Sequence, residues 1–335
     1  MRPSRKVYGI VLALVALIAA WSAFWKVAAS ATDAALDEWF AAERSAGRVW
    51  TCAERTIGGY PFRIAIRCAR PTFSGIVARA RLIGSTGDIL AAAHVFDPNL
   101  ILAEIVSPLR VEGPVERGNL LLEWRDFHVG YRSRDGAPRL GSLDIVAPRL
   151  KLTQGATEIE MSAENLDLAA RPDQAQPADG VVELSIKGAV VPFLDAVASQ
   201  NSPLDLAAVA TVAKIDAFSH PSGGPPAERW RRAGGNLRLT RAEFAKGALK
   251  IDATGALDLD DAHRPRGNID IAADGLSPIL DKFGIPASVL AIGSLLSGGP
   301  KNDGRPTGAR LSLSLRDGRA SIGPIRLPIV IAPLY

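Results

Sequence analysis

Apolar and polar residues alternate with a period of two along much of this chain, and this pattern limits its possible folds more than any other feature. Within residues 249–259, apolar residues or Gly at the odd positions alternate with Lys250, Asp252, Thr254 and Asp258. Successive side chains of a β-strand point to opposite faces, so this alternation is typical of a strand with one apolar and one wet face. Buried parallel strands are continuously apolar, so the pattern favours antiparallel sheet. The same alternation occurs at 76–82, 182–186, 237–239 and 311–315, and longer candidates are 119–131 and 142–152.

A strand–turn–strand–glycine–short-helix unit is predicted to occur twice, over residues 157–200 and 248–285. The glycine pairs Gly180/Gly188 and Gly267/Gly275 have the same spacing. Each pair precedes a proline, and proline favours the first turn of a helix. The predicted fold class is therefore mainly β, with an elongated or curved antiparallel sheet built partly from repeated units. The prolines are Pro192 and Pro278.

Residues 7–25 form an uncharged, apolar run near the N-terminus. At a rise of about 1.5 Å per residue, about 20 such residues span the ~30 Å hydrocarbon core of a bilayer. We expect a transmembrane signal-anchor helix within residues 1–29. The alternative is a cleaved signal peptide, for which residues 28–31 supply small side chains, but the apolar region of a signal peptide is usually only about 7–15 residues long.

The basic excess of the chain lies entirely around this run. Four of the 39 Lys and Arg residues precede the first acidic residue, and the remainder equal the 35 Asp and Glu residues in number. A nucleic-acid-binding protein needs clustered excess positive charge, so no nucleic-acid partner is predicted. Cations before the span place the N-terminus in the cytoplasm, which puts a single-pass protein in the inner membrane with its C-terminal domain in the periplasm. The four cations are Arg2, Arg5, Lys6 and Lys26.

Residues 30–47 are predicted to form a juxtamembrane helix before a β-rich exported domain, 48–335. Leu36, Trp39 and Phe40 recur at helical spacing, and Gly47 is placed to end the helix. The helix either continues the membrane span or packs this apolar stripe on the domain, and we expect the packing.

Cys52 and Cys68 are the only cysteines in the chain. They flank two strand-like runs joined by a glycine–proline turn, and an antiparallel hairpin would bring their thiols together. In an oxidising compartment such a pair is most simply a disulfide, worth about 3 kcal/mol for a loop of about 15 residues. A redox or zinc site is disfavoured because Cys-x-x-Cys spacing and nearby histidines are lacking. The hairpin motif is Gly58, Gly59, Tyr60, Pro61, Phe62 and Arg63.

The sequence predicts no catalytic, cofactor-binding or metal-binding residue. The four histidines lie in separate segments, and the common hydrolase, phosphate-loop and dinucleotide motifs are absent. The nearest metal-like cluster, residues 260–263 (Asp-Asp-Ala-His), falls in a predicted turn, where such residues are common. Glu158 and Glu160 are expected to face water. The histidines are His94, His128, His220 and His263.

A local basic cluster, Arg229–Trp230–Arg231–Arg232, has two interpretations. It could contact lipid headgroups or a partner protein, or it could form a solvated turn. On a domain that is otherwise neutral, the solvated turn is favoured.

The cysteine hairpin carries a family resemblance. Trp50, Cys52, the motif 58–63 and Cys68, directly after a membrane segment, resemble an uncharacterised bacterial family known as domain of unknown function 2125. The resemblance extends over essentially the whole exported region and implies an exported envelope protein of Gram-negative bacteria, with no established activity. Residues 255–276 more loosely resemble AsmA-like envelope proteins, which implies an elongated sheet that cradles acyl chains. The C-terminal residues similar to the family's ending are Leu315, Asp317, Gly318, Gly323, Pro324, Pro333, Leu334 and Tyr335.

Together these observations predict a non-enzymatic protein that binds lipid or an envelope partner through its apolar strand faces. A periplasmic scaffold without a ligand is the alternative, and an exported hydrolase using one histidine with an aspartate is less favoured. An open apolar groove would favour lipid contact, and a polar cleft that gathers His94, His128 or Asp261 with other acids would favour the enzyme.

Overall fold

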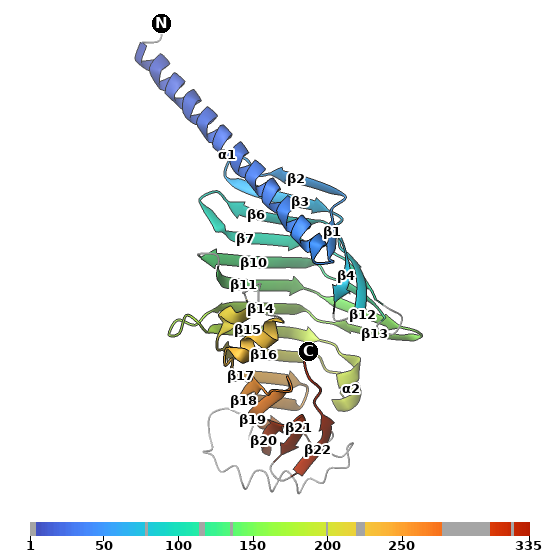
Figure 1. Cartoon of the computed structure of the whole chain (residues 1–335). Coiled ribbons are helices and arrows are strands. Elements are labelled where there is room, and N and C mark those ends of the chain that lie inside the picture. Colours follow the sequence, from blue (N-terminus) through green and yellow to red (C-terminus); the bar gives the residue numbers. More distant parts are fainter. Residues whose placement is uncertain are drawn as a thin grey trace. The chain divides into compact units, whose positions relative to one another are not determined.

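The computed structural model describes residues 5–77, 80–113, 118–134, 137–198, 200–218, 225–276, 309–322 and 325–335, and Figure 1 labels most of its elements. The chain divides into two compact units, which we call the first and the second unit. The first comprises Met1–Leu122 with Leu152–Thr157, and the second comprises Glu123–Lys151 with Glu158–Tyr335.

The first unit begins with one continuous helix, α1 (Arg5–Ser45). Among the described residues, Tyr8–Ser45 of this helix is the one helical segment that is long and apolar enough to span a membrane. Its most apolar stretch is not buried against the rest of the protein. The helix runs without a break through the segments expected to be transmembrane and juxtamembrane. Its second half contacts the first strands, since the Trp39 ring lies 5.9 Å from the Trp50 ring and the Arg55 guanidinium lies 5.8 Å from the Phe40 ring.

The described strands of the first unit form two antiparallel arrays. Cys52 and Cys68 are joined in a disulfide with their Cα atoms 5.3 Å apart, beside the β2–β3 hairpin. In one array the order is β2 (Glu54–Gly58), β3 (Arg63–Ala69), β6 (Ile89–His94) and β7 (Asp97–Ile105). In the other the order is β1 (Val49–Thr51), β4 (Thr72–Val77), β5 (Ala80–Ser85), β8 (Leu109–Glu112) and β9 (Asn119–Glu123).

The second unit is built on one long antiparallel array. Its order is β10 (Asp126–Arg134), β11 (Ala137–Val146), β14 (Asn165–Pro172), β15 (Gly180–Ala189), β16 (Leu204–Val212), β17 (Leu237–Lys246), β18 (Leu249–Leu259), β19 (Pro265–Asp274), β20 (Ala309–Arg316), β21 (Arg319–Ile322) and β22 (Ile325–Val330). Strands β12 (Arg149–Gln154) and β13 (Thr157–Ser162) hold residues of both units, as does β9 through its last residue, Glu123. The short helices are α2 (Pro192–Ala198), η1 (Ile215–Phe218) and α3 (Pro226–Arg232).

The prediction of a mainly antiparallel β protein with an N-terminal apolar helix is confirmed. The strands predicted at 182–186, 237–239, 249–259 and 311–315 lie within β15, β17, β18 and β20. In both predicted repeats the two strands are present as β14–β15 and β18–β19, and α2 follows the first pair. The helix expected after Pro278 lies outside the described residues.

Three segments predicted as single strands are each two strands, and those predictions were wrong. At 76–82, β4 ends at Val77 and pairs with β5 from Ala80 onward. The segment 119–131 breaks at Trp124, and 142–152 breaks at Ala147, whose φ of +52° lies in the left-handed region. A residue in that region ends an extended strand, and a period-two pattern gives no sign of it.

Candidate functional site

One face of the second unit's sheet is apolar across several neighbouring strands. Residues paired directly across an antiparallel ladder point to the same face, so the register identifies the rows. One row is Ile145, Leu166, Ile186, Leu206, Phe244 and Ile251, and the next is Leu143, Leu168, Leu184, Ala208, Ala242 and Ala253.

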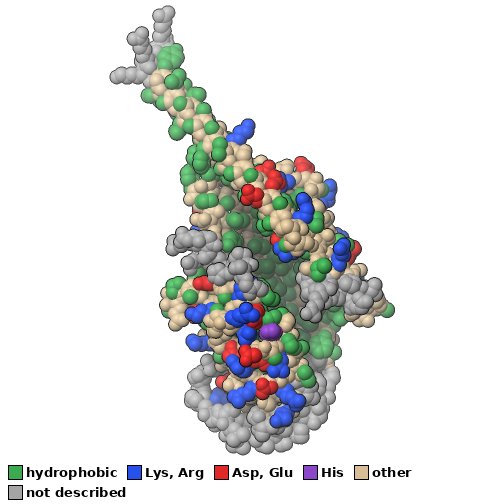
Figure 2. Space-filling view, in the orientation of Figure 1, with side chains coloured by type: hydrophobic (Ala, Val, Ile, Leu, Met, Phe, Trp, Pro, Cys, Tyr) green, Lys and Arg blue, Asp and Glu red, His purple; other side chains and the backbone are tan. Residues whose placement is uncertain are grey.

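This apolar face is not fully covered by protein. Leu168, the second residue of the second row, keeps 39% of its surface exposed, whereas Ile145 is buried. In the space-filling view, hydrophobic side chains gather on the hollowed face over β11 and β14 (Figure 2). We call the rows together with their hollow the apolar face.

A pocket of about 610 Å³ lies on the second unit, against α3 and η1. Binding pockets in proteins are usually about 300–1,000 Å³ and mainly apolar, so this pocket has the size and character of a ligand site. Its lining comes from five strands, two short helices and the segment after β22. The lining residues are Val182, Val212, Ile215, Phe218, Ala227, Trp230, Leu237, Leu257, Asp258, Leu259, Pro265 and Leu334.

Helix α3 covers this pocket because its sequence directs one large side chain inward. Pro226 starts the helix, a position that suits proline because its missing N–H would be unpaired there anyway. Trp230 is buried, its Nε1 donates to the carbonyl of Ala213 at 2.7 Å, and its ring lies 5.9 Å from that of Phe218. The indole therefore fixes α3 to the end of β16 and forms a wall of the pocket.

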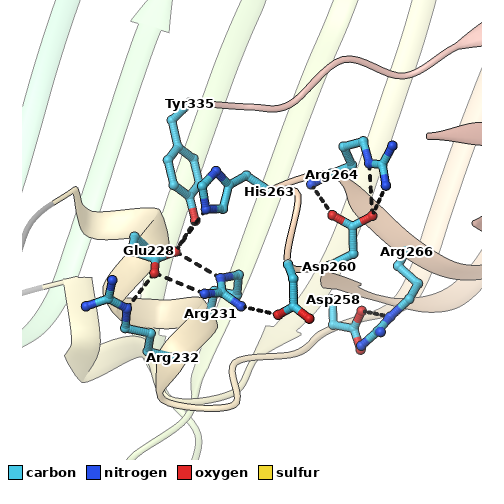
Figure 3. Close-up of polar contacts among 10 residues, drawn as sticks. Glu228, Arg231, Arg232, Asp258, Asp260, His263, Arg264, Arg266 and Tyr335 are labelled. Atoms are coloured by element: carbon cyan, nitrogen blue, oxygen red, sulfur yellow. Dashed lines mark hydrogen bonds and ion pairs between the residues drawn. The ribbon is translucent and has the colours of Figure 1, made fainter. Parts of the chain in front are cut away.

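Glu228 on α3 is buried and is the centre of a polar network (Figure 3). Its carboxylate accepts hydrogen bonds from Arg231 Nε at 2.9 Å, from Arg232 Nε at 2.5 Å and from the Tyr335 hydroxyl at 2.8 Å. The hydrogen bonds from Arg231, and then from Tyr335, hold the pKa of Glu228 far below its ordinary value. We call Glu228, Arg231, Arg232, His263 and Tyr335 the Glu228 network.

The network links α3 to the β18–β19 turn and to the segment after β22. His263 stacks on the Tyr335 ring with centroids 4.4 Å apart, and its Nε2 lies 3.5 Å from Glu228 Oε2. Arg231 also donates to Asp261 at 2.8 Å. Because Leu334 lines the pocket, these contacts hold one of its walls in place.

The acidic residues of the β18–β19 turn are paired with arginines. Asp260 accepts two hydrogen bonds from Arg264, at 2.9 Å from its N–H and 3.0 Å from its Nε, which lower the pKa of Asp260. Arg266 pairs with Asp258 at 2.8 and 3.0 Å. In the part of the chain that is described, no group of three potential ligands is arranged to hold a metal ion.

The basic cluster expected at residues 229–232 is largely neutralised within the second unit. Arg231 and Arg232 bond to Glu228, while Arg229 donates to the carbonyl groups of Ala217 and Phe218. The sequence identified this segment but not the acidic residue beside it as its partner. An Arg three and four residues after Glu228 was the available signal, since such pairs meet on a helix.

The other candidate residues are spread over the described chain. His94 lies beside Phe96 in the first unit, with ring centroids 5.4 Å apart, and His220 falls outside the described residues. His128 lies 4.0 Å from Asp144 on an exposed strand surface. Asp144 in turn faces Asp167 and raises the pKa of Asp167 by hydrogen bonding and repulsion. The structure thus brings His128 close to Asp144, and it places Asp144 and Asp167 in the lining of a second pocket of about 390 Å³ that shares no lining residue with the apolar pocket.

Glu158 and Glu160 are exposed on β13, as expected. Their carboxylates lie 2.7 Å from Lys151 Nζ and 3.7 Å from Arg149 Nε. They form surface ion pairs, which contribute little stability.

The fold and this pocket define an antiparallel β protein that has an N-terminal helix capable of spanning a membrane and an apolar site in its second unit. The chain belongs to a bacterial family described as "Uncharacterized protein conserved in bacteria (DUF2125)", which it matches over residues 25–330. The resemblance read from the cysteine hairpin is thereby confirmed, while these comparisons gave no support for the likeness to AsmA-like proteins. No curated protein and no solved structure matched the chain.

Proposed function

We propose that this chain is a non-enzymatic envelope protein that binds lipid acyl chains on the apolar face of its second unit. Helix α1 anchors it in the inner membrane and the β domain lies in the periplasm. The observation that carries the proposal is the pocket of about 610 Å³, whose lining is almost entirely apolar.

The chemistry of the pocket favours an apolar ligand. Two polar groups in its wall are already bonded within the protein, since Trp230 Nε1 donates to Ala213 and Asp258 accepts from Arg266. A ligand gains affinity there mainly by removing apolar surface from water, at about 25 cal/mol per Å². Acyl chains suit a surface of this kind, and the rows of aliphatic side chains on the apolar face extend it beyond the pocket.

Anchoring and export are supported by two independent features. Cations without acids precede the apolar run of α1, which orients a membrane helix with its N-terminus in the cytoplasm. The Cys52–Cys68 disulfide is typical of an oxidising compartment such as the periplasm. The absence of catalysis is also part of the proposal, and it rests on the lack of the common hydrolase, phosphate-loop and dinucleotide motifs in the sequence.

Native mass spectrometry of the full chain, purified from membranes in mild detergent, tests the lipid ligand. Ala227→Phe places a large ring in the pocket wall and should reduce the fraction of protein that carries phospholipid. Ala256→Phe is the matched control. Ala256 is exposed, and because successive residues of a strand point to opposite faces, it points away from the face of its neighbour Leu257, which lines the pocket. Both variants keep α1 unchanged, so the amount of lipid that adheres to this helix should be equal in the two. The difference in lipid-bound fraction between the variants therefore reports on the pocket.

Equal lipid occupancy in the two variants, with both folded, would refute the proposed site. A co-purifying protein in place of lipid would favour an envelope partner. A chain without any bound ligand would favour the scaffold.

A further inference from the structure

Two strand turns of the first unit meet α1 near the end of its apolar run. The turn between β2 and β3 is held by two indoles, because Trp21 Nε1 donates to the carbonyl of Pro61 at 3.0 Å and Trp25 Nε1 donates to that of Arg63 at 2.8 Å. The hydroxyl of Tyr60 lies 2.9 Å from that of Ser22.

The turn between β6 and β7 joins the same group through Phe96. Its ring centroid lies 5.5 Å from that of Trp21 and 6.5 Å from that of Phe62. Trp25 contacts Tyr60 edge to face at 5.6 Å. We call Trp21, Trp25, Tyr60, Phe62 and Phe96 the aromatic tip cluster.

The rings at the two turns remain largely exposed despite these contacts. Tyr60, Phe62 and Phe96 keep 50%, 53% and 70% of their surface open. Large apolar rings gathered at the tips of two turns are unusual on a surface that faces only water, and such patches mark interaction sites.

Charged residues begin directly beside these rings. Lys26 follows Trp25, Arg63 follows Phe62, and Asp97 follows Phe96. Tyrosine and tryptophan are enriched at the headgroup level of membranes, where one side of the ring is apolar and the other is wet. The aromatic tip cluster has the composition of such a boundary.

Helix geometry sets the depth of the cluster. At about 1.5 Å per residue, Trp21 lies roughly 21 Å along the helix from Val7, the first residue of the uncharged run. The hydrocarbon core of a bilayer is about 30 Å thick. Trp25 lies roughly 27 Å along the helix from Val7, close to the outer boundary of that core if α1 spans the membrane, and Trp21 lies about one helical turn deeper. The turns that hydrogen-bond to them therefore lie at that boundary or just inside it.

We infer that the β2–β3 and β6–β7 turns insert Tyr60, Phe62 and Phe96 into the interfacial layer of the bilayer that holds α1. The first unit is then fixed to the membrane at three places. This inference rests on the anchoring proposed above and is independent of acyl binding in the second unit.

A fluorescent probe on a single introduced cysteine tests it. The native cysteines are joined to each other, so Phe96→Cys in the oxidised full chain accepts a thiol-reactive nitrobenzoxadiazole label at one position. The labelled chain is reconstituted into phosphatidylethanolamine–phosphatidylglycerol vesicles that contain lipids with a nitroxide at the headgroup or deep in the acyl chain. Ala156→Cys, in the exposed turn between β12 and β13, is the matched control, and Leu17→Cys on α1 reports on the anchor.

We expect a blue shift of the Phe96→Cys probe and loss of most of its emission with the headgroup quencher, while the Ala156→Cys probe keeps the spectrum it has in water. Adding Phe62→Glu should reduce the quenching at position 96, because a charge at the same tip resists insertion. Quenching at Leu17 without quenching at Phe96 would overturn the inference and leave the anchor standing. Absence of quenching at both positions would overturn the anchor and the inference with it.

Discussion

The hydroxyl of Tyr335 donates a hydrogen bond to Glu228 Oε2 at 2.8 Å, although the two residues are 107 positions apart in the chain. This bond joins the segment after β22 to α3, the helix that covers the apolar pocket. Leu334, the neighbour of Tyr335, contributes to the lining. The hydrogen bond between Tyr335 and Glu228 therefore helps to hold Leu334 in its place in the pocket wall.

Removing the hydroxyl of Tyr335 should weaken this connection. Tyr335→Phe preserves the ring that stacks on His263 and deletes only the hydrogen-bond donor. We expect a loss of about 1 kcal/mol in the free energy of unfolding, the usual net value of a hydrogen bond, measured by urea denaturation of the full chain in detergent. Tyr131→Phe on β10 serves as the control, and equal losses in both variants would contradict a specific role for the bond.

Stability should fall in acid through Glu228. Its pKa is lowered in the folded protein, chiefly by hydrogen bonds from Arg231 and Tyr335, relative to an ordinary value of 4.5. The unfolded chain therefore takes up a proton first as the pH falls, so stabilisation that is complete at neutral pH is lost progressively below about pH 5.

The pH effect is checked by the midpoint of thermal unfolding between pH 7 and pH 4. Asp88 and Asp260 also have lowered pKa values and contribute in the same direction. Glu228→Gln, which cannot titrate, should flatten the pH dependence relative to the native chain. If the two curves run parallel, Glu228 is not a source of the acid sensitivity.

Local patterns in the sequence were sufficient to predict most of the fold. Alternation over 249–259 predicted β18 with its true bounds, and the turn between the cysteines predicted the β2–β3 hairpin. The breaks at Val77, Trp124 and Ala147 were missed because side chains can keep alternating through a tight turn or a single left-handed residue.

The pocket was harder to predict because its parts come from distant segments. Trp230 and His263 were noticed separately, as parts of a basic cluster and of a turn. The link between α3 and the β18–β19 turn depends on Tyr335 and on the pairing of β16 to β19, which no local pattern encodes. The basic cluster was noticed, but the pairing of Arg231 and Arg232 with Glu228 was not predicted.

The hairpin motif contains two adjacent glycines that should respond differently to alanine. Gly59 has a φ of +96°, and a Cβ there would lie 2.8 Å from the carbonyl oxygen of Arg63, whereas a Cβ on Gly58 meets nothing within 4 Å. Gly59→Ala should lower the free energy of unfolding by about 1–3 kcal/mol, the usual cost of a strained backbone residue. Gly58→Ala is the matched control and should lower it much less in the same urea titration.

A buried ion pair between Lys246 and Asp195 lies at the end of the apolar face that is away from the pocket. Lys246 is 1% exposed and lies in register between Leu204 and Leu249, two buried leucines. Its Nζ donates to the carboxylate of Asp195 on α2 and to the carbonyl of Ser202 at 2.5 Å. Asp195→Ala should therefore cost about 3–5 kcal/mol, because it leaves an uncompensated charge in an apolar site.

The double variant Asp195→Ala with Lys246→Met separates the cost of an unpaired charge from the loss of α2 packing. Methionine fills a similar volume without a charge, and replacement of a buried ion pair by apolar residues is often neutral or stabilising. Chemical unfolding of the full chain should therefore show the single variant well below the native protein and the double variant close to it. If the double variant is as unstable as Asp195→Ala alone, then the cost of the single substitution comes from contacts of Asp195 other than its pairing with Lys246, and not from the unpaired buried charge.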